Sequence, residues 1–541
     1  MKTYGARRRT HKASISVVAV SLCAGLLAGC TSTGVISGGS SVGSSAATPL
    51  PSGKYTALDG FYSQQITWGT CSAESGGDSS IDLSPFQCGT IDVPLDYSKP
   101  TGKVVKVAMV KWPAASASGK QGSLLTNPGG PGASGVDFVE GDRDKFDGAL
   151  HAHFDIIGFD PRGLGRSEPI KCLDDKAQDA LYEQDMPKEP AARKAKTEKD
   201  SKDLAAACEK NSGDLLPFLG SKYVAKDMDV MRQVLGDKKL NYLGISYGTY
   251  IGSVYAEEFP DKVGRLVLDG AVDPNADQLE ANVQQQIGFE KSLEKFASDC
   301  VTNNASECPL SGDGPTAAKQ IGTFIDGLRD HPLPTRSGRK LDQTLGGTGV
   351  IIGLYGDVGS DLWKYLRRGL TLAMKQGDGT LLLAGADQYD GRDASGHYST
   401  EQDGLIAVRC ADFNTPAPSP DAVQKAYDEL KNGAPILNSD LTKDDLAQPM
   451  CADWPFQTPE KPHQIRADGS DPILVVGTTD DPATPYQSAV NLAKGFANAR
   501  LLTRVGTGHA AFGSGNACTQ AAMEAYLTAG TLPAEGTRCT S

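Results

Sequence analysis

Ser246 is the residue whose surroundings most clearly suggest chemistry. It lies in GISYG at 244–248, after an apolar run at 240–245 and before a helical pattern that ends at Pro260. A sharp turn from strand to helix exposes a serine hydroxyl, and only small residues on either side let the neighbouring backbone pass. The motif alone is weak in a chain with 62 glycines, but its place between a strand and a helix predicts a nucleophile for acyl transfer.

A serine hydroxyl needs a base, so the sequence should also supply a histidine and an acid that orients it. Of the seven histidines, only His509 follows the late acidic turns, in GTGH at 506–509. An apolar run at 473–477 leads to Asp480 and Asp481, either of which could be the acid. The order Ser, Asp, His is the order expected after a nucleophile on a strand-to-helix turn. The alternative for His509 is an exposed loop histidine without a role.

A glycine-rich loop, NPGGPG at 127–132, follows an apolar run at 122–125 and could bind the oxyanion that acyl transfer creates. Preorganised N–H donors must face that charge, and glycines let the backbone approach the substrate closely. We assign the two donors to the amides of Gly130 and Tyr247. The alternative is that the loop is merely a tight turn.

The elements that must hold these residues alternate as they do around parallel sheets. Short β-rich runs alternate with helical stretches in 55–275, helical patterns dominate 276–460, and sheet character returns in 461–541. We therefore expect an α/β-hydrolase fold, with a mostly parallel central sheet built from the first and last segments and a helical cap inserted between them. Asp160 and Arg162 are interpreted as structural braces near the glycine-rich loop. The clearest strands are 104–110, 122–125, 154–159, 240–245, 266–268, 473–476 and 501–503.

The first 30 residues have the composition of a lipoprotein signal peptide. Five basic residues precede an apolar run at 13–28, and two small residues stand directly before Cys30. A lipid attached to Cys30 would anchor the chain to a membrane, whereas an ordinary cleavage site with an incidental cysteine is the alternative. Residues 31–54 form a flexible tether rich in Ser and Gly. We expect an exported protein, lipid-anchored on the outer face of the cell membrane or secreted.

Charge and cysteine content fit an exported enzyme better than a nucleic-acid binder. The chain has 53 basic and 66 acidic residues, and removing the five bases of the signal peptide leaves 48 minus 66, a net charge of −18. Such an acidic protein binds polyanions poorly, so we expect no nucleic-acid partner. An even set of cysteines in an exported chain indicates disulfides, and the predicted chemistry needs no metal or cofactor. We expect sequence neighbours to pair, as Cys71 with Cys88, Cys172 with Cys208, Cys300 with Cys308, Cys410 with Cys451, and Cys518 with Cys539.

Together these motifs resemble those of the secreted tripeptidyl aminopeptidases of Streptomyces and related actinobacterial α/β-hydrolases, cousins of the prolyl aminopeptidases. The resemblance runs from about Trp68 to Cys539 and implies that Asp481, directly before a proline, is the acid of the triad. Asp480 departs from the family pattern. The stretches that carry the resemblance are NPGGPGASG at 127–135, GFDPRGLGRS at 158–167, GISYGTY at 244–250, DPATPY at 481–486 and GTGHAAF at 506–512.

Members of that family remove short peptides, often tripeptides, from free N-termini beneath a helical cap. The resemblance therefore implies peptide or protein substrates with free N-termini, and an acidic anchor for the substrate ammonium, because a buried cation needs a paired charge. Asp412 and Asp453, beside cysteines of the predicted cap, are the candidate anchors, and exposed acids without a role are the alternative. The predicted function is an exported serine aminopeptidase that forms an acyl-enzyme at Ser246.

Two other functions remain open from the sequence. Fold does not fix substrate, so an esterase or lipase could use the same triad, although the many charges in 276–460 are unlike the apolar lid of a lipase. A surface lipoprotein that binds peptides without turning them over would also fit the fold. The presence of Ser246, Asp481 and His509 at the expected places favours an enzyme.

Overall fold

Ten strands form one sheet in the structure, a computed structural model that describes residues 54–72, 81–413, 416–448, 451–456, 458 and 461–540. The strands are β1 (Gly69–Thr70), β2 (Gln87–Pro94), β3 (Val104–Trp112), β4 (Ser123–Asn127), β5 (Asp155–Phe159), β6 (Leu240–Ile245), β7 (Val263–Asp269), β10 (Ile473–Asp480), β11 (Ala499–Thr507) and β12 (Arg538–Cys539). Their spatial order is β1-β2-β3-β5-β4-β6-β7-β10-β11-β12. Pairs from β5 to β12 are parallel, and β1, β2 and β3 add an antiparallel edge. The predicted mostly parallel sheet is confirmed.

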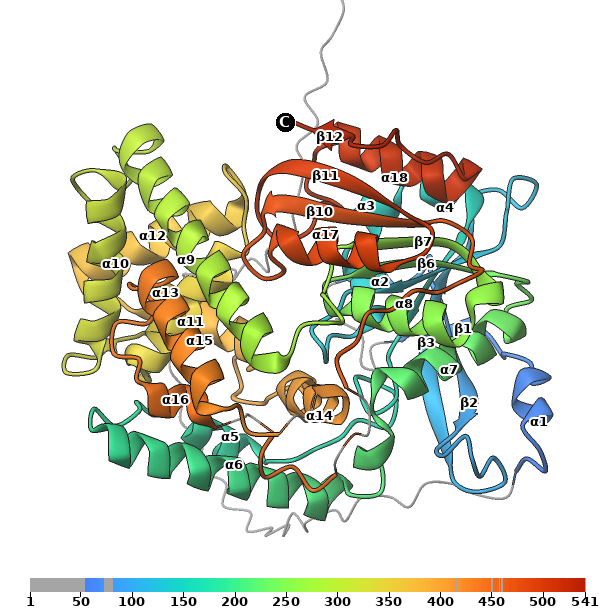
Figure 1. The fold of residues 1–541 in the computed structure, drawn as a ribbon, viewed down its shortest axis with the longest axis horizontal. Helices are drawn as coiled ribbons and strands as arrows, with labels where there is room; N and C mark the ends of the chain where they lie inside the picture. Colours follow the sequence, from blue (N-terminus) through green and yellow to red (C-terminus); the bar gives the residue numbers. More distant parts are fainter. Residues whose placement is uncertain are drawn as a thin grey trace, which may run out of the picture. The chain divides into compact units, whose positions relative to one another are not determined.

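Helices cover both faces of this sheet (Figure 1). Successive side chains of a strand point to opposite faces, so Leu124 and Ile156 enter one core while Leu125 and Ile157 enter another. Strands β4 and β5 are buried along their whole length, as parallel strands between two helical layers should be. One core is built with α1 (Asp59–Tyr62), α7 (Ser221–Val234), α8 (Tyr247–Glu258) and α17 (Tyr486–Gly495), and the other with α2 (Gly135–Gly141), α3 (Arg143–Phe146), α4 (Ala149–His153) and α18 (Ala517–Ala529).

Between β7 and β10 the chain leaves the sheet and forms a group of helices, the cap, beside it (Figure 1). The cap has its own apolar core, in which Trp363, Leu366 and Leu370 of one helix are fully buried at helical spacing. A small hairpin of β8 (Leu333–Pro334) and β9 (Lys340–Leu341) was not predicted. The cap helices are α9 (Gln278–Asn303), α10 (Gly314–Leu328), α11 (Gln343–Leu354), α12 (Asp361–Gln376), α13 (Thr380–Asp390), α14 (Glu401–Phe413), α15 (Pro420–Gly433) and α16 (Lys443–Ala447).

Two helices from the first half of the sequence also reach the cap. Helices α5 (Asp175–Tyr182) and α6 (Pro190–Ser212) lie between β5 and β6 along the chain. Arg193 of α6 bonds to Asp445 at 2.8 Å and to Asp440 at 3.1 Å, both in or near α16. Figure 1 shows α6 running beneath α14 and α16. The sequence assigned this whole segment to the sheet domain, and the structure adds part of it to the cap.

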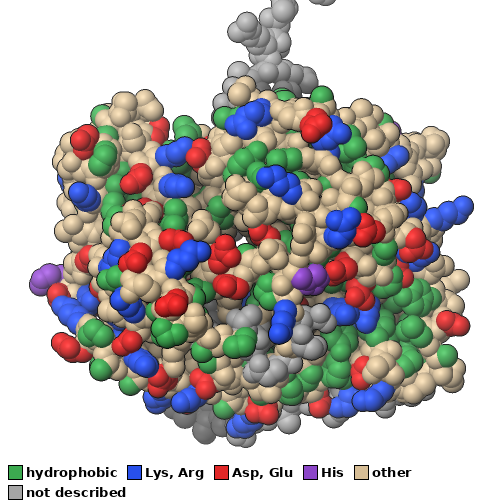
Figure 2. Space-filling view, viewed as in Figure 1, with side chains coloured by type: hydrophobic (Ala, Val, Ile, Leu, Met, Phe, Trp, Pro, Cys, Tyr) green, Lys and Arg blue, Asp and Glu red, His purple; other side chains and the backbone are tan. Residues whose placement is uncertain are grey.

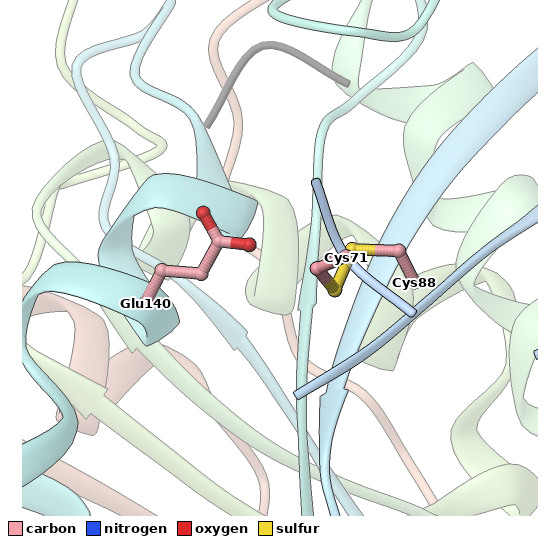
Figure 3. Close-up of side chains that lie close together, drawn as sticks. All are labelled: Cys71, Cys88 and Glu140. Carbon is pink, nitrogen blue, oxygen red and sulfur yellow. A yellow bond between two sulfur atoms is a disulfide. The ribbon is translucent and has the colours of Figure 1, made fainter. Parts of the chain in front are cut away.

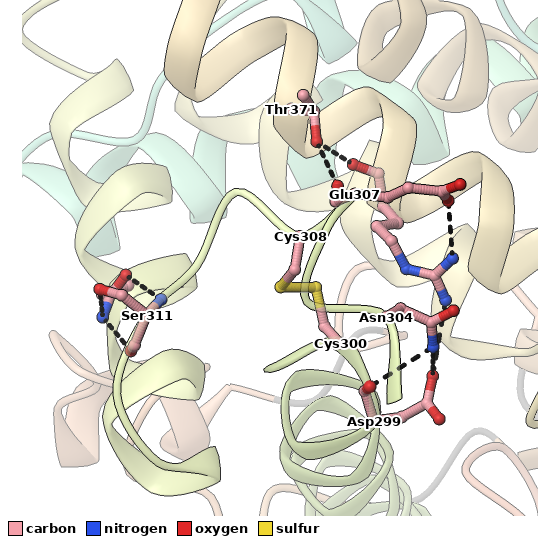
Figure 4. Close-up of a disulfide and its surroundings, with 9 residues drawn as sticks. Asp299, Cys300, Asn304, Glu307, Cys308, Ser311 and Thr371 are labelled. Carbon is pink, nitrogen blue, oxygen red and sulfur yellow. Dashed lines mark hydrogen bonds and ion pairs between the residues drawn. A yellow bond between two sulfur atoms is a disulfide. The ribbon is translucent and has the colours of Figure 1, made fainter. Parts of the chain in front are cut away.

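Five disulfides join the cysteines that are neighbours in sequence, which are the pairs that the sequence predicts. Figure 4 shows the bond between Cys300 and Cys308, which closes the turn after α9. Glu307 in this turn pairs with Arg367 of α12 at 3.5 Å, and its carbonyl accepts a hydrogen bond from Thr371 at 3.1 Å. The disulfide therefore fixes a turn that connects two cap helices.

The predicted signal peptide at 1–30, its Cys30 and the tether up to residue 53 lie outside the described residues. Lys54, the first described residue, forms an ion pair with Asp92 of β2. Among the helices of the described segments, none combines the length and apolar character that crossing a bilayer requires.

Candidate active site

Ser246 lies at the turn between β6 and α8, in a backbone conformation that few residues other than glycine adopt. Its φ is +54° and its ψ is −123°, and its amide donates to the carbonyl of Asp269 at 2.9 Å. A side chain at position 244 would lie 2.5 Å from the carbonyl of Gly248, so the turn has room only for glycine there. This is the strained strand-to-helix turn that the GISYG motif predicts.

The glycine-rich loop after β4 packs directly against this turn. A Cβ at Gly129 would lie 2.5 Å from the carbonyl of Ile245 and 2.8 Å from the amide of Tyr247. Gly130, which has a φ of +100°, lines the same cavity as Ser246 and Tyr247. The structure therefore brings together the nucleophile candidate and the two residues whose amides were assigned to the oxyanion.

Asp160 and Arg162 hold the surroundings of this loop and do not line the cavity. The Asp160 carboxylate accepts hydrogen bonds from Ser134 Oγ at 2.5 Å and from the amide of Arg166 at 2.7 Å. Ser134 caps α2, the helix that follows the glycine-rich loop. Arg162 is fully buried and binds Asp227 of α7 through two nitrogens, at 2.6 and 2.7 Å. These contacts agree with the interpretation of both residues as braces.

His509 and Asp481 meet beyond the ends of β10 and β11. The imidazole Nδ1 lies 2.9 Å from Oδ1 and 3.1 Å from Oδ2 of Asp481. The Asp481 side chain is fully buried and also accepts hydrogen bonds from the amides of Ala483, Thr484 and Ala510 at 2.9 to 3.0 Å. These backbone donors fix the carboxylate, which in turn fixes the orientation of the imidazole.

Asp480, the other acid that the sequence allowed, has a different partner. Its carboxylate lies 2.6 Å from Nζ of Lys295 in cap helix α9. Asp480 is the last residue of β10, and this contact turns its carboxylate to the cap, whereas Asp481 follows the strand. The hydrogen-bond partner of His509 in this structure is Asp481.

Asp269, which the sequence analysis did not single out, connects the serine turn to the histidine loop. It ends β7, and its carboxylate accepts hydrogen bonds from the amides of Ala511, at 2.9 and 3.0 Å, and Phe512, at 2.6 Å. Because its carbonyl also accepts from Ser246, one residue contacts both segments. An acid followed by glycine at the end of a buried strand, Asp269-Gly270, was the signal that could have identified it.

Burial and charge act on these groups in opposite directions. Burial alone would lower the pKa of His509, but the charge of Asp481, its hydrogen bond and the charge of Asp269 together raise it above the ordinary value. Burial raises the pKa of Asp269 to about 6, despite the two backbone amides that favour its charged form. Two carboxylates therefore raise the pKa of His509: Asp481, which it contacts, and Asp269, which acts through its charge alone.

The cap completes the surroundings of His509. The amide of His509 donates to the carbonyl of Tyr355 at 3.0 Å, and the two rings meet edge to face with centroids 5.6 Å apart. Asp357 forms an ion pair with Arg504 and accepts a hydrogen bond from Thr507. Neither cap residue was predicted, because nothing in the local sequence connects them to the histidine loop.

A cavity of about 350 Å³ opens in front of Ser246 between the sheet and the cap. Its walls come from the glycine-rich loop, from α9 and the segment before it, and from α14. Within the described residues Ser246 Oγ forms no hydrogen bond, so the hydroxyl is available, and such contacts commonly tighten only with substrate. Three acids line the cavity, of which Asp277 and Glu280 are exposed and Asp273 is half-buried.

The two acids that the sequence offered as ammonium anchors do not line this cavity. Asp412 is buried behind Tyr247, and its carboxylate accepts from Tyr247 Oη at 2.5 Å, from Ser221 Oγ at 2.7 Å and from Ser221 N at 2.8 Å. Asp453 is half-buried in the turn after Cys451. The geometry gives Asp412 a positioning contact with Tyr247 and lends no support to direct contact with substrate.

One group in the described segments has the spacing of a metal site, formed by Cys71, Cys88 and Glu140. Figure 3 shows the Glu140 carboxylate facing the two sulfur atoms. Those sulfur atoms are bonded to each other, and a disulfide offers no thiolate to a metal. The residues therefore do not fit a metal centre.

The chain is similar in sequence to two family models and to several bacterial hydrolases. Two family models match, one described as alpha/beta hydrolase fold over residues 122–307 and one described as TAP-like protein over residues 438–539. The chain is 38% identical to serine protease Hip1 of Mycobacterium tuberculosis over 462 residues, 84% of this chain and 87% of that protein. It is 38% identical to carboxylesterase B of the same organism over 478 residues, 88% and 90% of the two chains. Tripeptidyl aminopeptidase of Streptomyces lividans is 31% identical over 487 residues, 88% and 86% of the two chains. These matches cover most of each protein rather than one shared domain.

Proposed function

We propose, from the premise that the chain belongs to the family of α/β-hydrolases that includes Hip1 and the Streptomyces tripeptidyl aminopeptidase, that it is an exported serine peptidase. It releases short peptides, such as tripeptides, from substrates with free N-termini. The observation that carries the proposal is the cavity that joins Ser246 to Gly130 and Tyr247, beside the hydrogen-bonded pair of His509 and Asp481.

Each residue has one task in this mechanism. His509 takes the proton of Ser246 as the hydroxyl attacks the scissile carbonyl, and Asp481 stabilises the imidazolium that results. The amides of Gly130 and Tyr247 bind the oxyanion. His509 then protonates the departing amine and activates a water that releases the acyl peptide. The chemistry needs no cofactor.

The substrate ammonium binds at the mouth of the cavity in this proposal. Asp273, Asp277 and Glu280 line it, and carboxylates there would pair with a free N-terminus at some distance from Ser246. Replacing Asp277 with Asn should raise KM for peptides with a free N-terminus and leave KM for N-acetylated esters unchanged. Asp453→Asn, outside the cavity, is the matched control, and equal effects of both changes would contradict the anchor.

Export and lipid attachment at Cys30 belong to the same proposal. Five disulfides support an oxidising compartment, because cytosolic thiols are kept reduced. Mass spectrometry of the mature N-terminus tests the anchor: a diacylglycerol on Cys30 is expected, and an unmodified N-terminus elsewhere would contradict it.

The decisive test of function is product analysis with free and N-acetylated versions of one peptide library. Loss of cleavage on acetylation supports an aminopeptidase, and cleavage of both versions would instead indicate an endopeptidase or general hydrolase. Ser246→Ala should abolish both cleavage and labelling by a fluorophosphonate. A protein that the probe fails to label at Ser246 would be a peptide-binding lipoprotein and not an enzyme.

An esterase is the second candidate, since one relative of equal identity is named carboxylesterase B. The cap argues against a lipid substrate, because Figure 2 shows acidic and basic side chains interspersed over it. Comparing peptide anilides with short-chain and fatty-acid esters distinguishes the two: a higher kcat/KM for the anilides is expected.

A further inference from the structure

Arg409 is a cation in the wall of the cavity that the proposed mechanism does not use. It projects from cap helix α14 and lines the same cavity as Ser246 and Tyr247. It is half-buried, and its Nη2 donates a hydrogen bond to Asn282 Oδ1 at 3.0 Å. Asn282 is neutral, so this bond orients the guanidinium without compensating its charge.

No carboxylate among the described residues lies within 4.0 Å of the Arg409 guanidinium. This distinguishes it from the arginines that are buried in the described segments, each of which pairs with at least one aspartate: Arg162, Arg193, Arg232, Arg367 and Arg504. Burial lowers the pKa of Arg409, and only tyrosine side chains oppose this effect. A cation removed from water without a partner is costly, so such a group commonly awaits an anion.

None of the three acids that line the cavity forms an ion pair with Arg409, and two of them have other partners within the described residues. Asp277 caps α9 by accepting from the amide of Glu280 at 2.8 Å. Asp273 accepts from the amide of Asn275 at 2.9 Å and from Asn491 Nδ2 at 2.7 Å. The cavity therefore presents acids towards solvent and a separate cation in its wall. A ligand that satisfies both must carry both an ammonium and a carboxylate.

We propose that Arg409 is a specificity-determining residue that binds a carboxylate of the substrate peptide. A guanidinium presents two parallel N–H donors that match the two oxygens of a carboxylate. An uncharged group of the same shape, such as an amide, cannot accept both hydrogen bonds equally well. The carboxylate is either an acidic side chain in the bound peptide or the free C-terminus of a short substrate. This inference rests on the proposed peptidase function and narrows its substrate class to peptides that place a carboxylate beside Arg409.

The test compares charged substrates with matched uncharged ones. Peptide anilides that differ only by Glu or Gln at each acyl-side position report side-chain recognition, and short peptides with a free or amidated C-terminus report terminal recognition. In the wild type, one pair should show a preference for the charged member of about 10- to 100-fold in kcat/KM, the range of a charge-assisted pair. Arg409→Gln should reduce that ratio to about one while kcat/KM for the uncharged substrate changes little.

Two further variants separate recognition from folding and from net charge. Arg409→Lys keeps the charge but loses the paired donors, so part of the preference should remain. Arg368→Gln removes the same charge from an exposed position on cap helix α12 and should leave the ratio unchanged. A wild-type ratio near one for both substrate pairs, or an unchanged ratio in Arg409→Gln, would overturn the inference.

A binding measurement keeps this inference separate from the proposed function. Peptide amides with Glu or Gln compete with a fluorophosphonate for Ser246, and this competition requires no turnover. Stronger protection by the Glu peptide in the wild type, lost in Arg409→Gln, supports the carboxylate site even if no peptide is cleaved. Peptide cleavage with equal protection by the Glu and Gln amides, and equal protection by a short peptide with a free and with an amidated C-terminus, would leave the peptidase standing and remove the carboxylate site.

Discussion

Replacing Asp412 with Asn distinguishes the two roles that this residue has been given. The sequence suggested a direct anchor for the substrate ammonium, whereas the structure shows a buried carboxylate behind Tyr247. If Asp412 positions Tyr247, its loss should affect every substrate alike. If it binds the ammonium, its loss should affect only substrates with a free N-terminus.

The structure gives the size of the effect. The carboxylate accepts three hydrogen bonds from Ser221 and Tyr247, and an amide keeps one acceptor oxygen but forces the two hydroxyls to reverse. A bond to a charged group contributes about 1 kcal/mol more than a neutral one, so Asp412→Asn should cost about 2 to 3 kcal/mol of unfolding free energy. Losing one oxyanion donor outright lowers kcat by about 10²- to 10³-fold, so a shift of the Tyr247 amide should lower it by about tenfold.

The assay measures denaturant unfolding, and kcat and KM for one peptide anilide with a free and with an acetylated N-terminus, or for matched esters if acetylation blocks turnover. We expect lower stability, a lower kcat for both substrates and no change in the ratio of their KM values. Asp453→Asn is the control, since Asp453 lies outside the cavity. A rise in KM confined to the free amine, at unchanged stability, would refute the positioning role and restore the ammonium anchor.

Other substitutions test the remaining contacts. Asp481→Asn should lower kcat by about 10⁴-fold, as loss of a triad acid does. Asp480→Asn, which removes only the ion pair with Lys295, should cost no more than about 1 kcal/mol of stability and leave kcat unchanged. A large loss of kcat in Asp480→Asn with little loss in Asp481→Asn would instead make Asp480 the acid of the triad. Asp269→Asn removes a negative charge that favours the imidazolium, so the pKa of His509 should fall. The acidic side of the pH profile of kcat/KM should then move to lower pH, and an unchanged profile would exclude an effect of Asp269 on His509. Replacing both Cys410 and Cys451 by Ser opens a loop of sequence separation 41, which raises the entropy of the unfolded chain. The free energy of unfolding should fall by about 4 kcal/mol, and a fall below about 1 kcal/mol would contradict this reasoning.

The parts of the fold that could be predicted are those with a strong local pattern. The run predicted at 240–245 is β6, and the predicted starts of β3, β5 and β10 agree with the structure within a residue. Strand β2 was missed because QCGTIDVP mixes polar residues, glycine and proline, and only its second half is buried. The serine, the histidine and the glycine-rich loop were found for the same reason, since each belongs to a motif that local backbone geometry requires.

Contacts between distant segments could not be predicted in this way. Asp412 stands 165 residues from Tyr247 and 191 from Ser221, so its position beside a cysteine said nothing of its partners. Arg409, three residues earlier, looked like any helix arginine until the structure placed it half-buried, without a carboxylate partner among the residues that the structure describes. The chemistry of such a residue depends on which neighbours are absent, and a local motif does not contain that information.

The contact between Tyr355 and His509 changes how the cap should be understood. By connectivity the cap is an insertion between β7 and β10, which suggests that it could be removed or exchanged without harm to the catalytic groups. Yet the amide of His509 donates to a cap carbonyl, and Asp357 of the cap binds Arg504 and Thr507 at the end of β11, directly before the loop that carries the base. A Cβ at Gly508, where φ is +89°, would lie 3.2 Å from Asp357, so the loop is shaped to fit the cap closely. The position of the base therefore depends on the docked cap, and the sheet alone does not define the active site.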